Sequence, residues 1–269
     1  MNNPMKADMQ TETFTLHRGT APLLVSLPHD GSGVPGDIAA RLTESARQTP
    51  DTDWHVSRLY AFARELGASM LVPNFSRYVV DLNRPPDDVS LYPGQNTTGL
   101  CPVVQFSGEP VYLDGQQPTP DEIAGRIERY WRPYHDALRA ELDRIHAMHG
   151  RGLLWEGHSI KGSELRFLFD GRLPDLNLGT AAGVSCSPRL QLRLESTLAA
   201  QTDYDYIVNG RFKGGHITRH YGDPANGIDA VQLEISQRTY MDEATSRYDE
   251  AKAAEAQRAI RGLLEAALG

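Results

Sequence analysis

The chain has 269 residues, 40% of them hydrophobic, which fits one large domain or at most two with a substantial core. A net charge of −8 without any block of Lys and Arg argues against a nucleic-acid-binding protein. No apolar run is long enough to span a membrane and the first 20 residues lack the apolar core of a signal peptide, so we expect a cytoplasmic protein with no membrane partner. The two cysteines, Cys101 and Cys186, have no C-x-x-C spacing and predict neither a disulfide framework nor a zinc ribbon.

The first third of the chain predicts short elements separated by turns. Residues 1–12 are polar and mixed in charge, and we expect them to form a disordered or loosely packed lead-in before a single domain at 13–269. The apolar run at 23–27 is bounded by Pro and Gly and predicts a strand buried on both faces. The other expected elements are an edge strand at 13–17, a helix at 37–47, a helix at 56–66 capped by 51–53, and strands at 69–72 and 77–82.

Longer elements are expected in the rest of the chain. Residues 87–117 are rich in loops, and 119–148 carry the longest helical stripe, with a kink at Pro133 and His135 on the solvated face. The remaining predictions are strands at 152–155, 165–169, 204–208 and 231–236, and helices at 188–201 and 242–268. Strands and helices alternate throughout, which predicts an α/β domain whose mixed, mostly parallel central sheet is flanked by helices on both faces.

Side chains with metal-ligand chemistry stand at the ends of predicted strands. His29 and His158 each follow a short buried run, and Glu234 lies on a third. Zinc hydrolases hold the ion with three N or O ligands and keep a further carboxylate nearby for proton transfer, and Asp53 completes such a set. Spacing alone does not show that these residues converge, and a single His more often caps a strand by hydrogen bonding to a loop. A serine nucleophile is disfavoured because no Gly-x-Ser-x-Gly motif is present.

Six short motifs are spread over the chain: SLPHDG (26–31), TDWH (52–55), DLNR (81–84), GHS (157–159), GGHITR (214–219) and QLEIS (232–236). Together they resemble the N-formylglutamate amidohydrolase family, the deformylases that end one bacterial route of histidine degradation. That family is related to zinc carboxypeptidases and aspartoacylases, so the resemblance implies their α/β architecture and a metallo-amidohydrolase domain at 13–269. It also implies one divalent metal ion, zinc in the first place, with cobalt or another divalent ion as alternatives.

The resemblance implies a ligand set of His29, Asp53 and His158. The carboxypeptidase pattern has a Glu three residues after the first His, whereas this chain has Ser32 there, so the carboxylate ligand comes from elsewhere. Asp30, Asp51 and Glu156 are the alternatives to Asp53. Glu156 lies two residues before His158 and points to the same side of a strand, which favours a role in orienting His158 from outside the ligand set.

Substrate contacts are also implied by the resemblance. Asn83 and Arg84 look like the Asn-Arg pair that binds a substrate carboxylate in aspartoacylases and carboxypeptidases, and a guanidinium pairs with a carboxylate through two parallel hydrogen bonds. A surface ion-pair role is the alternative for Arg84. A second substrate carboxylate needs a second cation, for which we expect Arg219, followed by Lys213, Arg211 and Arg238; for each, a solvated surface charge is an equal alternative.

The resulting hypothesis is metal-dependent hydrolysis of the formamide of N-formyl-L-glutamate to formate and L-glutamate. The resemblance implies a metal-bound water as nucleophile, and Glu234 would take the proton of that water and deliver it to the departing amine. The partner is then a small molecule with acidic groups. Alternatives are a metallo-hydrolase of another N-acyl amino acid and an inactive, metal-dependent binding protein for acidic amino acids. The sequence does not indicate an oligomeric state.

Overall fold

A mixed sheet forms the centre of the protein, whose computed structural model describes residues 12–91, 94, 96–162, 165, 168 and 171–269. Within these residues the sheet has seven strands in the order β1-β3-β2-β4-β7-β5-β6. Strands β3, β2, β4 and β7 run parallel, whereas β1 pairs antiparallel with β3 and β5 with β7. The strands are β1 (Phe14–His17), β2 (Leu23–Ser26), β3 (Ser69–Pro73), β4 (Gly152–Ile160), β5 (Leu176–Gly179), β6 (Tyr206–Val208) and β7 (Ile228–Ser236), with a separate hairpin of β8 (Met241–Asp242) and β9 (Arg247–Tyr248).

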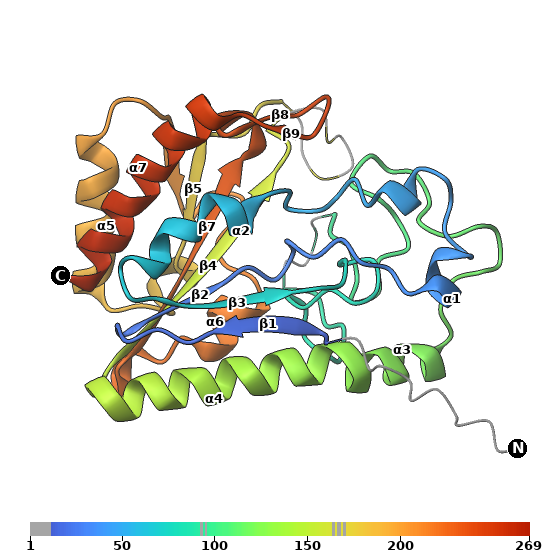
Figure 1. Cartoon of the computed structure of the whole chain (residues 1–269), viewed down its shortest axis with the longest axis horizontal. Coiled ribbons are helices and arrows are strands. Elements are labelled where there is room, and N and C mark those ends of the chain that lie inside the picture. The colour runs from blue at the N-terminus through green and yellow to red at the C-terminus, as the bar shows by residue number, and fades with distance from the viewer. Residues whose placement is uncertain (1–11, 92–93, 95, 163–164, 166–167, 169–170) are drawn as a thin grey trace, which may run out of the picture.

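Helices cover both faces of this sheet, which confirms the expected α/β architecture. One face packs against α2, α5 and α7, and the other packs against α4 and α6. Figure 1 shows the long α4 along the bottom of the view, and α5 and α7 at the upper left. The helices are α1 (Gly36–Ala39), α2 (Val56–Leu59), α3 (Pro120–Arg126), α4 (Arg132–His149), α5 (Pro188–Ala200), α6 (His216–Tyr221) and α7 (Glu250–Leu268). In the described part of the chain no helix has both the length and the apolar character needed to cross a bilayer.

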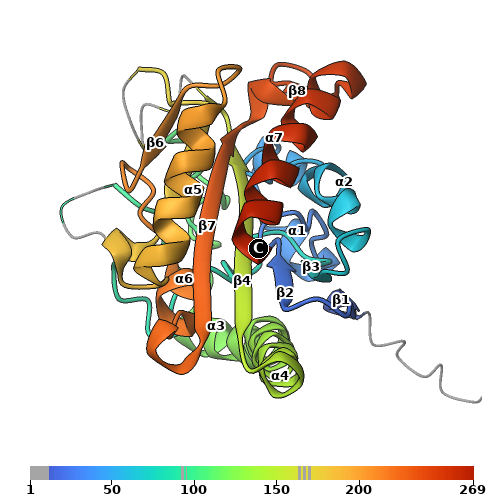
Figure 2. The same cartoon turned by 90° about the vertical axis from the view of Figure 1, so that its left-hand side faces the viewer.

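Strands β4 and β7 lie side by side at the centre of the sheet (Figure 2), and on one face their side chains change from apolar to polar towards the carboxyl ends. On the α5 and α7 face, Trp155 of β4 and Val231 of β7 belong to one apolar core. On the α4 and α6 face, Leu154 belongs to the second apolar core, but His158 of β4 and Glu234 of β7 follow towards the carboxyl ends and pair in register. Because neighbours in register point to the same face, polar chemistry is concentrated at one end of this face.

The longest predicted helix is interrupted. Thr119 caps α3 by accepting a hydrogen bond from the N–H of Glu122 (3.3 Å), as the sequence pattern favours. A π-helical turn at Ile127–Trp131 then joins α3 to α4, and Pro133 is the second residue of α4, directly after this turn. His135 is buried, contrary to the expectation of a solvated face, because its ring packs against Trp131 with centroids 3.6 Å apart.

Several predicted elements differ from the structure. The helix expected at 37–47 ends at Ala39, because the chain beyond it pairs Leu42 with Tyr112. The helix expected at 56–66 is split between α2 and a 3₁₀ turn at Ala61–Arg64. The helix expected from 242 begins at Glu250, because the β8–β9 hairpin precedes it and Asp249 caps it. Most of the strand expected at 165–169, and the lead-in before residue 12, lie outside the described residues.

The strand expected at 77–82 is a series of turns. The carbonyl of Val79 accepts a hydrogen bond from the buried guanidinium of Arg126 (2.9 Å) instead of from a neighbouring strand. This irregular backbone lets both Arg77 and Asp81 turn towards the carboxyl end of the sheet, where they line one pocket. In a regular strand, residues four positions apart share a face but are spaced about 13 Å apart, whereas the turns bring Nη2 of Arg77 to 2.8 Å from Oδ2 of Asp81.

Candidate active site

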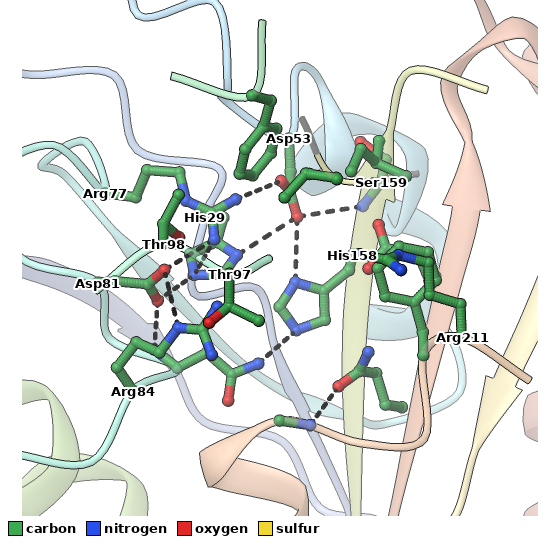
Figure 3. A pocket seen from close by; sticks show the side chains of 18 of the residues that line it. His29, Asp53, Arg77, Asp81, Arg84, Thr97, Thr98, His158, Ser159 and Arg211 are labelled. Carbon is green, nitrogen blue, oxygen red and sulfur yellow. Dashed lines mark hydrogen bonds and ion pairs between the residues drawn. The ribbon is translucent and has the colours of Figure 1, made fainter. Parts of the chain in front are cut away.

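Three candidate metal ligands meet at the carboxyl ends of β2 and β4. His29 follows β2, His158 lies near the end of β4, and the N–H of Asp53 donates to the carbonyl of His29 (3.0 Å). All three residues are buried, and one ligand atom from each lies within 4.8 Å of the other two. Figure 3 shows the Asp53 carboxylate between the two imidazole rings. The structure thus brings together the three side chains that the family resemblance implies as ligands.

The outer nitrogen of each imidazole is held by a carboxylate. Nε2 of His29 lies 2.6 Å from Oδ1 of Asp81, and Nε2 of His158 lies 3.1 Å from Oε1 of Glu156. The Nδ1 atoms face the other way and lie 3.8 Å and 3.1 Å from Oδ2 of Asp53, respectively. A histidine that donates its Nε2 proton to a carboxylate keeps the Nδ1 lone pair available for a cation. Both rings therefore present their ligand atom to the same point.

Glu156 is fixed from its other side. Its Oε2 accepts hydrogen bonds from the N–H (3.2 Å) and the hydroxyl (2.6 Å) of Thr218 on α6. Since β4 and α6 both hold this carboxylate, it acts on the ring of His158 from a rigid position. Its neighbour Gly157 points to the opposite face, where a Cβ would lie 2.9 Å from the Tyr60 ring, so the strand needs a glycine between these two functional residues.

The other acidic candidates for the ligand position have structural partners. Asp30 accepts a hydrogen bond from the N–H of Ser57 (2.9 Å) and so caps α2, the task that the sequence assigned to residues 51–53. Oδ2 of Asp51 accepts hydrogen bonds from the Tyr78 hydroxyl and the Phe106 N–H. Asp53 instead accepts from the N–H of Ser159 (3.1 Å), which orients its carboxylate towards the histidines.

Electrostatics in the cluster suit a bound cation. Burial, together with the Arg77 guanidinium, lowers the pKa of His29 and keeps its ring neutral, as a metal ligand must be. Burial opposes ionisation of Asp53, but the pKa of Asp53 is lowered overall, chiefly by its hydrogen bond to His158. Burial also opposes the charge on His158, but Glu156 and Asp53 raise its pKa, so a cation arriving there displaces a proton.

Arg77 and Asp81 form a buried ion pair beside this cluster, and no sequence pattern predicts a role for either of them. Nη2 of Arg77 lies 2.8 Å from Oδ2 of Asp81 and 3.3 Å from Nε2 of His29, and Nη1 lies 3.9 Å from Oδ1 of Asp53. The Arg77 guanidinium also packs over the Phe106 ring, 4.7 Å from its centroid. This arginine thus places a fixed positive charge against the ligand cluster. The one sequence feature that points to these two residues is their pair of opposite charges, four residues apart in an otherwise apolar run.

Glu234 lies across the same pocket. It is buried, and it pairs in register with His158 on the neighbouring strand. Burial raises the pKa of Glu234 to about 8, against the lowering effect of His158. A carboxyl group with a pKa near neutrality both accepts and donates protons readily, which is what general acid–base catalysis needs. It is not one of the three clustered ligands.

The pocket that contains these groups has a volume of about 110 Å³. Its polar rim includes Arg84, Arg211, Thr97 and Thr98, and Figure 3 shows Arg84 and Arg211 on different sides of the histidines. Two buried polar atoms on its wall, Nε of Arg77 and Oγ1 of Thr98, have no partner among the described residues. The cavity therefore contains the buried carboxyl group of Glu234, a cluster of three candidate metal ligands and two arginines on its rim. Two further polar atoms on its wall have no hydrogen-bond partner among the described residues.

The predicted substrate residues take up different positions. Arg84 lines the pocket, with Nε 4.0 Å from Oδ2 of Asp81. Asn83 also lines it, but its amide is engaged, because Oδ1 accepts from the N–H of Ile217 (2.9 Å) and Nδ2 lies 3.1 Å from Nε2 of His158. Arg219 is exposed on α6, donates to the Gly214 carbonyl (2.9 Å), and is not among the residues that line the pocket.

Among the lesser candidates for the second cation, only one reaches the pocket. Arg211 lines it, whereas Lys213 and Arg238 do not. The guanidinium of Arg238 binds the carboxylate of Asp175 (2.5 Å) and the carbonyl of Leu173 (2.7 Å). The pocket lining therefore favours Arg211 among the cations that the sequence suggests.

Comparison with known proteins agrees with this geometry. The chain matches the family model for N-formylglutamate amidohydrolase over residues 21–241, a span that contains every residue of the ligand cluster and Glu234. It is 50% identical to an N-formylglutamate deformylase of Pseudomonas putida and 52% identical to one of Pseudomonas aeruginosa, in each case over 96% of both chains. This chain belongs to the N-formylglutamate amidohydrolase family.

Solved structures share the fold of this family member. An N-formylglutamate amidohydrolase of Ralstonia eutropha JMP134 superimposes with a TM-score of 0.80 at 29% identity, covering 94% of this chain and 97% of that one. A gene product of Agrobacterium tumefaciens gives a TM-score of 0.69 at 17% identity, covering 96% and 97% of the two chains. The second likeness supports the fold alone.

Proposed function

We propose that this amidohydrolase-family member hydrolyses the formamide of N-formyl-L-glutamate to formate and L-glutamate. The observation that carries the proposal is the buried cluster of His29, Asp53 and His158, which shares one pocket with Glu234 and with arginines on the rim. The names of the Pseudomonas relatives support the choice of substrate. The same proposal places the reaction in the cytoplasm, at the last step of the histidine-degradation route that the family resemblance implies.

The ligand cluster fits one divalent metal ion, for which we propose zinc, with cobalt or another divalent ion as alternatives. Two imidazole nitrogens and one carboxylate oxygen are the donor set of a catalytic zinc site, and three protein ligands leave coordination positions open. When bound, such an ion supplies Lewis-acid activation of the formyl oxygen and of the attacking water. The carboxylates of Asp81 and Glu156 keep the two ligand rings in the tautomer that this role requires.

Glu234 moves the proton. Its carboxylate takes one proton from water as the oxygen attacks the formyl carbon, and it delivers this proton to the glutamate nitrogen as the C–N bond breaks. Atoms balance, since formamide and water give formate and the protonated amine, which receives both protons of the water. Because the pKa of Glu234 is raised to about 8 by burial, a nearby cation is needed to favour its carboxylate form at neutral pH. The proposed base therefore depends on the proposed metal.

The arginines of the pocket recognise the substrate and stabilise charge. Arg84 binds one substrate carboxylate, and Arg211 takes the role first expected of Arg219, because it reaches the pocket and Arg219 does not. The buried guanidinium of Arg77 is held by Asp81 and lines the pocket, so it supplies a preorganised positive charge beside the reacting groups. Asn83 holds the start of α6 by accepting a hydrogen bond from the N–H of Ile217.

Formate release from a panel of N-acyl amino acids tests the proposal. The protein is treated with a chelator, reloaded with zinc or cobalt, and assayed with N-formyl-L-glutamate, N-formyl-L-aspartate and N-acetyl-L-glutamate. We expect turnover of N-formyl-L-glutamate only after reloading, and slower turnover of the other two. Faster release of acetate would indicate a hydrolase of another N-acyl amino acid. Binding of acidic amino acids without any hydrolysis would indicate an inactive binding protein.

A further inference from the structure

Gln232 stands on the wall of the catalytic pocket and has no part in the mechanism above. It lies on β7, two residues before Glu234, so the two side chains point to the same face of the sheet. The residue lines the pocket, and only 4% of it is exposed. An amide offers one acceptor oxygen and two N–H donors, so its role depends on which of these atoms faces the pocket.

The orientation of this amide is fixed through its oxygen. Oε1 of Gln232 accepts a hydrogen bond from the N–H of Gly215 (2.8 Å), the residue directly before α6. A flipped amide would place its own N–H groups against that N–H, and two donors would then face each other. Gly215 is itself packed against Asn83, because a Cβ at this position would overlap the Asn83 amide. Nε2 of Gln232 is therefore the atom that is left for another partner.

Nε2 of Gln232 is an unused donor. It donates to no residue in the described part of the chain, and it is not one of the fully enclosed polar atoms. Its in-register neighbour on β4, Glu156, has both oxygens engaged, one by His158 (3.1 Å) and one by the Thr218 hydroxyl (2.6 Å). Because Gln232 is otherwise buried and lines the pocket, the accessible part of this N–H₂ group faces the pocket. A rigid donor in this position suits an acceptor atom of a ligand.

Gln232 lies on the same side of the pocket as Arg211. Its in-register partner on β5 is Gly179, and the backbone of 212–214 passes so close that a Cβ on Gly179 would lie 2.8 Å from it. Arg211 comes directly before this segment and lines the pocket. Arg84 lies on a different side of the histidines (Figure 3). A guanidinium and a fixed amide donor therefore serve one side of the pocket.

We propose that Gln232 is a substrate-binding residue, whose Nε2 donates a hydrogen bond to the same substrate carboxylate that Arg211 binds. A carboxylate has two acceptor oxygens, so it accepts from a guanidinium and from an amide at once. The amide does this without adding a charge beside Glu234. The identity of the ligand rests on the proposed function, whereas the unused donor and its orientation do not.

Substrates that lack one carboxylate test this role. Gln232→Met removes the donor and keeps a side chain of similar length. The substrates are N-formyl-L-glutamate, N-formyl-L-norvaline, which lacks the side-chain carboxylate, and N-formyl-4-aminobutyrate, which lacks the α-carboxylate. We expect KM for N-formyl-L-glutamate to rise by about tenfold or more, with kcat changed less than about threefold. For one of the two truncated substrates, kcat/KM of variant and parent should agree within about twofold, and that substrate identifies the carboxylate.

Two results would overturn the proposal. One is a change of KM below about twofold for N-formyl-L-glutamate in Gln232→Met. The other is an equal loss of kcat/KM with all three substrates, because a distortion of α6 through the lost Gly215 contact does not depend on a carboxylate.

Two further variants locate the effect. Gln257→Met is the matched control, since Gln257 is a half-buried glutamine of α7 that donates to the Leu59 carbonyl (3.1 Å) and does not line the pocket. It should change KM less than about twofold with each substrate. Arg211→Met should lose its effect on the same truncated substrate as Gln232→Met. Loss on the other substrate would mean that the two residues bind different carboxylates, which contradicts the proposal.

Calorimetric titration with L-glutamate separates this inference from the proposed function. L-Glutamate carries both carboxylates, and its binding to the metal-loaded protein needs no turnover. A parent protein that binds L-glutamate but releases no formate would refute the proposed function alone. Gln232→Met should still weaken L-glutamate binding by about tenfold, and an unchanged affinity would overturn the role of Gln232.

Discussion

The metal-type cluster and the arginine rim of the catalytic pocket are built in opposite ways. His29 and His158 follow or lie on buried strands, and a second carboxylate holds the far side of each ring. Arg84 and Arg211 lie on irregular segments and are partly exposed, with 16% of the Arg84 side chain accessible. Under the proposed function, chemistry would be placed on the rigid sheet and substrate recognition on the loops, where specificity can change without moving the reacting centre.

The largest expected effect concerns the proton carrier on the rigid side. Glu234→Gln removes the only group that the account uses for proton transfer, while keeping shape and hydrogen bonding. We expect kcat for formate release to fall by about 10³-fold or more, with little change in KM. Metal content is the companion measurement and should stay unchanged, since Glu234 is not one of the clustered ligands. Near-normal turnover of this variant would refute its role as the base.

The support of the ligand rings is the next point to test. Asp81→Asn keeps the shape of the group beside Nε2 of His29 but removes its charge. We expect metal affinity to fall by about 10- to 100-fold, measured by competition with a chromogenic chelator. Asp37→Asn, at an exposed position of α1, is the control and should leave the affinity unchanged. If both variants bound metal like the parent, the outer carboxylate would have no orienting role.

The arginine rim is tested by a pair of matched substitutions. Arg84→Met removes a cation that lines the pocket, and Arg219→Met removes one that does not. We expect Arg84→Met to raise KM for N-formyl-L-glutamate by about tenfold or more, because a charge-assisted hydrogen bond to the substrate is lost, and Arg219→Met to change KM less than about twofold. The reverse result would restore Arg219 as the carboxylate-binding residue and remove Arg84 from the site.

The same contrast explains what could be predicted from the sequence. His29, His158 and Glu234 were placed at strand ends by short buried runs, and register fixes the position of such residues. Their convergence with Asp53 came from the family resemblance, because no local pattern states which turn packs beside which strand. The sequence ranks Arg219 above Arg211, yet of these two only Arg211 lines the pocket, since the positions of loop residues depend on packing between distant segments. Arg77 and Asp81 were missed because their turns resemble a strand by composition.

A smaller effect, on the pH dependence of stability, is expected at His135, where the rigid core meets the loop of Asn83 and Arg84. His135 of α4 is hydrogen-bonded through Nε2 to the Leu82 carbonyl (2.8 Å) and through Nδ1 to the Tyr221 hydroxyl (2.9 Å). Burial lowers the pKa of His135 to about 3. Because this value lies below that of an unfolded histidine, about 6.5, the unfolded chain binds the proton first as the pH falls, and the stability that the neutral ring contributes above about pH 6.5 is progressively lost.

The pH dependence of unfolding measures this contribution. Between about pH 7.5 and pH 5.5, His135 should reduce the free energy of unfolding by about 1.4 kcal/mol. The glutamine of His135→Gln binds no proton in either state. Over the same pH interval, the free energy of unfolding of this variant should therefore fall by about 1.4 kcal/mol less than that of the parent protein, whatever its value at pH 7.5. Identical pH dependence in urea unfolding of the two proteins would show that His135 does not stay neutral in the folded state.

Metal counting across the ligand cluster tests the central claim most directly. Elemental analysis of the chelator-treated and zinc-reloaded protein should find one ion per chain, recovered in step with formate release, and His158→Ala should lose both together. Full turnover of N-formyl-L-glutamate by chelator-treated protein, with less than about one ion per ten chains, would contradict a catalytic metal held by His29, Asp53 and His158.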